Sequence, residues 1–126
     1  DEWNIRGMKE GLEYAILTNE ITKAWADKDV KSYKKLKGLK KENLRDNMTN
    51  LELVLNMLAE ASTTEISKVK KPKSIDENID VARKGGHAAK QARLEIEKQT
   101  GKSIISSKNA KNLLQKSENE NKNIEE

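Results

Sequence analysis

The side chains most often used for catalysis or metal binding are scarce in this chain. Its 126 residues include one His, His87, and no Cys. Cys nucleophiles, thiolate metal sites, disulfide frameworks and His-pair metal sites are therefore excluded. No Ser and Asp stand at a spacing that would support His87 as the base of a triad, an arrangement that geometry rather than spacing defines. We interpret His87 as a surface or packing residue.

Two further patterns could carry chemistry, and both are better explained structurally. Glu95 and Glu97 lie about 200° apart on a helix, so they do not face one shared site and are interpreted as solvated charges. Arg83–His87 contains two glycines but lacks the flanking strand that a phosphate loop needs. We therefore expect no catalytic residues, no metal ligands and no cofactor, and we do not expect an enzyme.

Lysines are the residues whose number and clustering suggest a ligand. Such clusters attract phosphate backbones or acidic protein surfaces, and the alternative is that they are solvated helix faces. Only four of the 25 basic residues are Arg, which argues against sequence-specific reading of DNA bases. The candidate nucleic-acid-binding residues are Lys31, Lys34, Lys35, Lys37, Lys40, Lys41, Arg45, Lys68, Lys70, Lys71 and Lys73.

The charge is divided along the chain. Residues 117–126 contain four Glu and one Lys, a net charge of −3, which leaves +7 on residues 1–116. We expect residues 117–126 to be a disordered acidic tail and residues 1–116 to be one helical domain. No run approaches the roughly 18 apolar residues of a membrane span, and no signal peptide opens the chain. The prediction is a cytoplasmic protein without a membrane partner.

Helical periodicity and capping signals position these residues. Apolar stripes predict a helix over 8–25 with Leu12, Ile16, Ile21 and Trp25 inward, and a short helix over 30–37 with Val30, Tyr33 and Leu36 inward. Gly38 is expected to end the second helix. A short helical turn over 43–48 and a last helix that includes Ala110, Leu113 and Leu114 complete an all-α domain of about five helices.

Two longer helices should form the centre of the domain. Thr49 to Glu52 is a capping box that begins a helix whose first half is apolar almost all round, which is typical of a core helix or an oligomer interface. Ser74 to Glu77 begins another helix, which ends at Gly101. Its mid-helix glycines would be tolerated where another backbone packs closely. The candidate interaction or core residues are Leu51, Val54, Leu55, Leu58, Gly85, Gly86 and Ala89, and core is the favoured interpretation.

Residues 12–110 resemble the C-terminal region of phage antirepressors that carry a BRO-type N-terminal domain, and the bacterial DNA-damage-inducible protein D looks related. The stretches concerned are 14–21 (YAILTNEI), 33–49 (YKKLKGLKKENLRDNMT), 51–61 (LELVLNMLAEA), 63–66 (TTEI), Gly85-Gly86, Ala92-Arg93 and 100–106 (TGKSIIS). The chain lacks the N-terminal BRO-type domain and begins at Asp1 rather than Met, so we expect it to be a fragment or a processed form.

The resemblance implies a phage or prophage regulator in a bacterial cytoplasm. Two hypotheses follow. In the first, the chain is a protein-interaction and oligomerisation module that acts on a repressor or on a recombinase of the DNA-damage response. In the second, it binds nucleic acid directly and without sequence specificity through the lysines of 28–45 and 68–73, with DNA as its partner.

Overall fold

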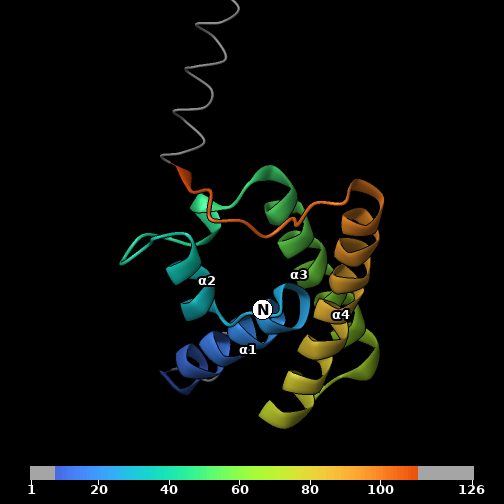
Figure 1. Cartoon of the computed structure of the whole chain (residues 1–126). Coiled ribbons are helices and arrows are strands. Elements are labelled where there is room, and N and C mark those ends of the chain that lie inside the picture. Colours follow the sequence, from blue (N-terminus) through green and yellow to red (C-terminus); the bar gives the residue numbers. More distant parts are fainter. Residues whose placement is uncertain (1–7, 111–126) are drawn as a thin grey trace, which may run out of the picture.

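The computed structural model describes residues 8–110, and these form an all-helical unit (Figure 1). Its helices are α1 (Met8–Ala26), α2 (Val30–Leu36), α3 (Asn50–Lys70) and α4 (Ile75–Thr100), with a single 3-10 turn at Arg45–Asn47. The all-α prediction is confirmed for these residues, with four α-helices where about five were expected. The expected last helix beyond Ala110 and the acidic tail at 117–126 lie outside the described residues.

Capping residues begin and end the helices largely where the sequence indicates. Asp29 caps α2 by accepting from Ser32 N, and Thr49 and Glu52 form the predicted reciprocal capping box of α3. Ser74 caps α4 by accepting from Glu77 N, whereas the carboxylate of Glu77 accepts from Lys73 N instead of closing the second box. Two of the stops have the left-handed backbone that favours glycine, with φ of +70° at Gly38 and +72° at Gly101.

Helix α4 packs against both α1 and α3, and its two glycines make this possible (Figure 1). A Cβ on Gly85 would lie 2.0 Å from Thr63 Oγ1 and 2.6 Å from Thr63 N of α3. A Cβ on Gly86 would lie 2.4 Å from the Cβ of Ala24 and 2.9 Å from the carbonyl oxygen of Ile21, both in α1. The expected reason for mid-helix glycine is therefore confirmed: each residue removes the side chain where a neighbouring helix comes closest.

Residues 101–110 return from the end of α4 across the first turns of α3 to the region beside α2 (Figure 1). Ile104 of this segment is buried and Ile105 packs on the core, as the plug predicted for this apolar pair. Ala110 N donates to Asn47 Oδ1 at 2.9 Å. We call residues 101–110 the return segment.

Three predicted inward positions are wrong. In α1 the buried stripe is Leu17, Ile21 and Trp25, while Leu12 and Ile16 are exposed. In α2 Tyr33 is fully buried, but Leu36 is exposed. The reason is that α2 turns a lysine inward at its end, and the helix therefore rotates the neighbouring leucine outward.

Within the part of the chain that the structure describes, no helix is both long enough and apolar enough to cross a membrane.

Candidate functional site

The most unusual surface feature is a row of apolar side chains along the first half of α3. Leu51, Val54, Met57 and Leu58 are all exposed, and Val54 retains 58% of its accessible surface. Leu51, Val54 and Leu58 follow the three- and four-residue spacing of one helix face, with Met57 at its edge. We call these four residues the α3 apolar face.

The favoured core interpretation is therefore wrong for Leu51, Val54 and Leu58, and it is correct for Leu55. Helix α3 packs against α1 and α4 on one side only, through Glu52, Leu55, Asn56, Ala59 and Thr63. An apolar residue on the opposite side of the helix has no neighbour among the described elements. The predicted core residues Gly85, Gly86 and Ala89 of α4 are buried.

The candidate nucleic-acid-binding lysines do not form one surface. The first group surrounds α2 and the loop before α3, whereas the second surrounds the turn between α3 and α4. These groups lie at opposite ends of α3, whose 21 residues span about 30 Å. In the second group Lys68 pairs with Glu65 at 3.1 Å, and the remaining members, Lys70, Lys71 and Lys73, are exposed.

The first lysine group is itself heterogeneous. Lys31, Lys35, Lys40 and Lys41 are exposed, and none takes part in an ion pair recorded among residues 8–110. Lys34 is half-buried, and Arg45 pairs with Glu60 at 2.7 Å. The exposed four are thus the members of this group that are placed to meet a phosphate.

Lys37 is a correction, because it is buried and cannot contact a nucleic acid. Its side chain has no accessible surface, and its Nζ lies 2.7 Å from Glu52 Oε1, whose side chain is equally enclosed. Nζ also donates to the carbonyl oxygens of Ser106 at 3.0 Å and Lys108 at 2.6 Å. A buried ammonium requires such compensation. Lys37 therefore holds the return segment against α2 and α3.

Glu52 is the centre of this buried group. Besides the ammonium of Lys37, its carboxylate accepts from the hydroxyl of Tyr33 and from Thr49 N at 2.9 Å. Burial and the hydrogen bond to the Glu52 carboxylate raise the pKa of Tyr33 well above its usual value of 10. Tyr33 therefore stays protonated as a donor, and Glu52 connects α2, α3 and the return segment.

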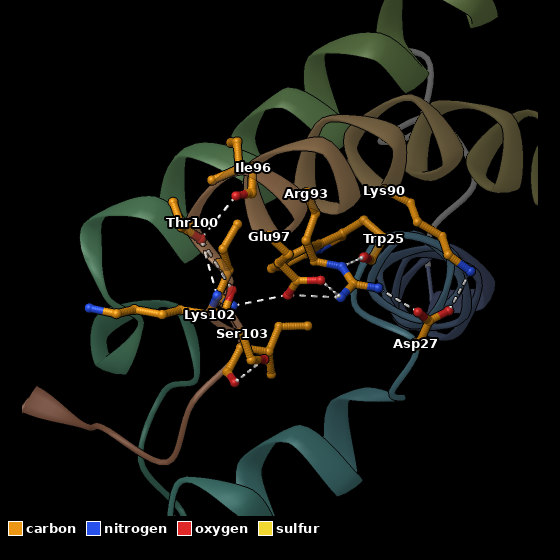
Figure 2. A network of polar contacts seen from close by, with 11 residues as sticks. Trp25, Asp27, Lys90, Arg93, Ile96, Glu97, Thr100, Lys102 and Ser103 are labelled. Carbon is orange, nitrogen blue, oxygen red and sulfur yellow. Dashed lines mark hydrogen bonds and ion pairs between the residues drawn. The ribbon is translucent and has the colours of Figure 1, made fainter.

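A second polar network joins α1 to the last turns of α4, and Figure 2 shows its arrangement around Arg93. The guanidinium donates to the carbonyl oxygen of Trp25 at 2.8 Å, to Asp27, and to both carboxylate oxygens of Glu97 at 3.0 and 3.2 Å. Glu97 Oε2 also accepts from Ile104 N at 2.9 Å. The interpretation of Glu97 as a solvated charge is wrong, because it anchors Arg93 and the start of the return segment.

Asp27 has an unusual backbone and a charge that the network stabilises. Its φ is +60°, a left-handed value that Asp and Asn tolerate better than most residues. Partial burial acts to raise its pKa, but the hydrogen bonds and charges of Lys90 and Arg93 outweigh it, so the pKa lies below the ordinary 3.8.

Replacing Asp27 with Asn is therefore expected to remove the charge while keeping the backbone conformation. Because the pKa of Asp27 is lowered in the folded state, its contribution is present above pH 4 and is lost as the pH falls through the folded-state pKa. We expect a loss of about 0.5–1 kcal/mol near pH 7, as for an exposed ion pair. Urea unfolding at pH 7 and near pH 2.5 checks this, and a difference that persists unchanged at the lower pH would contradict it.

The described residues offer no arrangement for catalysis or metal binding that we can identify. His87 is exposed and its ring nitrogen lies 3.3 Å from the side-chain nitrogen of Gln91. Among residues 8–110 no three His, Cys, Asp or Glu side chains come together in a way that could hold a metal ion.

Two functional features escaped the sequence-based argument. A buried Lys–Glu pair has no local signal, because Lys37 and Glu52 belong to different helices and each resembles a surface residue by type. The inward position of Lys37 could have been suspected from its place four residues after Tyr33 on the same helix face.

Comparisons with known protein families, with curated proteins and with solved structures found no match to this chain.

Proposed function

We propose that this domain is a protein-interaction and oligomerisation module of a phage or prophage antirepressor-like regulator, and that it self-associates through the α3 apolar face. The observation that carries the proposal is the exposure of Leu51, Val54, Met57 and Leu58 on one helix. Adjacent exposed apolar side chains of this kind are typical of protein contact surfaces. The resemblance of residues 12–110 to antirepressor C-terminal regions supports a regulator that acts on a repressor or a DNA-damage-response protein.

A second copy of the chain fits this face because the face is self-complementary. Two α3 helices packed antiparallel about a two-fold axis near Val54 would place Leu51 of one copy opposite Leu58 of the other. A two-fold interface uses the same patch on both partners, so such a symmetric apolar row meets its own requirement. The more polar second half of α3, with exposed Thr64, Glu65 and Lys68, would bound the contact.

Val54→Glu is expected to abolish self-association without unfolding the domain. It places two carboxylates against each other at the two-fold axis, which should raise the dissociation constant at least about a hundredfold. Sedimentation velocity over a concentration series measures the effect, and circular dichroism checks the fold.

Thr64→Glu provides the matched control, because Thr64 is exposed on the same helix but outside the apolar face. It should leave the association unchanged. A wild-type chain that remains monomeric at high concentration, or equal effects of the two substitutions, would count against self-association through this face.

Direct nucleic-acid binding is the second candidate, and one specific observation favours it. Lys31, Lys35, Lys40 and Lys41 are exposed around α2 and the following loop without a recorded ion pair among the described residues. These ammonium groups are therefore available to neutralise phosphates.

Charge reversal at Lys35, Lys40 and Lys41 tests that candidate. If each contacts one phosphate, log Kd should depend less steeply on log salt, by a slope of about 0.9 per lost contact on duplex DNA. Fluorescence anisotropy with a labelled duplex at several salt concentrations measures the slope. Absence of binding by the wild-type chain at low salt would refute the candidate.

A further inference from the structure

A cavity of about 360 Å³ lies between α1, α2, the 3-10 turn and the middle of α3. Its lining includes three buried apolar side chains, Ile21, Leu44 and Met48. The volume lies at the lower end of the range for small-molecule pockets. Asn56 and Glu60 contribute from a side of α3 that differs from the apolar face, since Asn56 is rotated by about 200° from Val54. The cavity and the α3 apolar face are thus separate features.

Asn56 supplies a buried donor to this cavity. The residue is 9% exposed, and its Oδ1 accepts from Trp25 Nε1 at 3.2 Å. Because an indole nitrogen can only donate, this bond fixes which end of the amide meets Trp25. No hydrogen bond to Nδ2 is recorded among residues 8–110, yet no fully enclosed side-chain nitrogen or oxygen there lacks a partner. The NH₂ group therefore retains access to open space, which is the cavity that Asn56 lines.

The charges around the cavity leave an excess of one positive charge. Arg45 and Glu60 both line it and neutralise each other at 2.7 Å. Lys34 also lines it, is half-buried, and has no recorded ion pair among the described residues. A partly desolvated cation attracts an anion more strongly than a fully hydrated one. The cavity thus combines an apolar floor, a buried NH₂ donor and an unpaired ammonium.

We propose that this cavity binds a small organic monocarboxylate with an apolar body. The apolar part covers Ile21, Leu44 and Met48, and the carboxylate accepts from Lys34 of α2 and from the amide of Asn56 of α3. This inference does not depend on self-association through the α3 apolar face. A neutral or cationic compound of the same shape would forgo the interaction with Lys34.

Titration of the ¹⁵N-labelled full chain with phenylacetate, phenylacetamide and phenethylamine tests the proposal by NMR. The three probes share a phenyl ring and differ in charge. Phenylacetate should give saturable shifts of amides in 18–22, 43–48 and 56–60, and the other two should bind at least about tenfold more weakly, the effect of one charge-assisted hydrogen bond. Equal binding of all three, or no saturable shift with phenylacetate, would overturn it.

Three variants separate a built site from a general attraction of anions. Asn56→Asp keeps an acceptor for Trp25 Nε1 but removes the NH₂ donor and adds a negative charge, so phenylacetate binding should be lost. Lys34→Gln should weaken it about tenfold. Lys35→Gln is the matched control, because Lys35 is the exposed neighbour and does not line the cavity. Circular dichroism checks that Asn56→Asp folds, and Lys34→Gln decides the question if it does not. Equal losses from Lys34→Gln and Lys35→Gln would contradict the proposal.

Discussion

Glu52→Gln is expected to destabilise the domain by about 3–5 kcal/mol, because it leaves the ammonium of Lys37 buried without its counter-ion. Both side chains are fully enclosed, and the Nζ to Oε1 distance is 2.7 Å. The carbonyl oxygens of Ser106 and Lys108 would remain near Nζ, but they carry no net charge. The free energy of unfolding in urea measures the loss.

A double-mutant cycle with Lys37→Met separates the ion pair from ordinary packing. Methionine fills much of the volume of the lysine side chain without its charge, and the double variant Lys37→Met/Glu52→Gln contains no buried charge at this position. We therefore expect the double variant to be more stable than the sum of the single losses predicts. Strict additivity would show that the two groups do not interact as the structure indicates.

The same variants have a local effect that can be measured separately. Because Lys37 holds the carbonyl oxygens of Ser106 and Lys108, its loss should loosen the return segment more than the helices. Trypsin should then cleave Lys37→Met after Lys102 or Lys108 faster than it cleaves the wild-type chain. Unchanged cleavage would mean that the apolar contact of Ile104 holds the segment without the ammonium.

Gly85→Ala is expected to destabilise the domain by about 1–3 kcal/mol, although alanine favours helix by about 1 kcal/mol over glycine. The new Cβ would lie 2.6 Å from the backbone nitrogen of Thr63, so a side-chain rotation cannot relieve the contact. Helices α3 and α4 would have to separate along their interface. Urea or thermal unfolding followed by circular dichroism measures the loss.

Gly11→Ala is the matched control for the glycine prediction. Gly11 lies in α1, and a Cβ built on it meets nothing within 4 Å. The substitution therefore reports helix propensity alone and should stabilise the domain by about 0.5–1 kcal/mol. If both variants were stabilised equally, α4 would not approach α3 as closely as described.

Much of the local structure could be predicted because its signals are local. The capping box at Thr49 and the glycine stops at 38 and 101 depend on residues a few positions apart, and they form as expected. The close packing at Gly85 and Gly86 could also be anticipated, since two glycines inside an otherwise regular helix need a steric reason. The identities of the partners, Thr63 and Ala24, could not, because they come from other helices.

The errors share one cause, which is that residue type does not determine the side on which a helix is covered. The all-round apolar pattern of 51–58 was compatible with a core helix, and the leucines of this segment split between the core and the surface because neighbours pack on one side of α3 only. Lys37 resembles the solvated lysines around it in every local respect. Its burial depends on a carboxylate 15 residues away and on two carbonyl oxygens about 70 residues away.

The sequence by itself determined that this is an all-helical domain with few groups suited to catalysis, because helical periodicity, caps and composition are properties of short segments. Only the tertiary structure decided which lysines are free, which apolar side chains remain on the surface, and where Asn56 and Lys34 meet a common cavity. Burial and ion pairing arise between segments far apart in the chain, and their energies depend on distances that folding alone establishes.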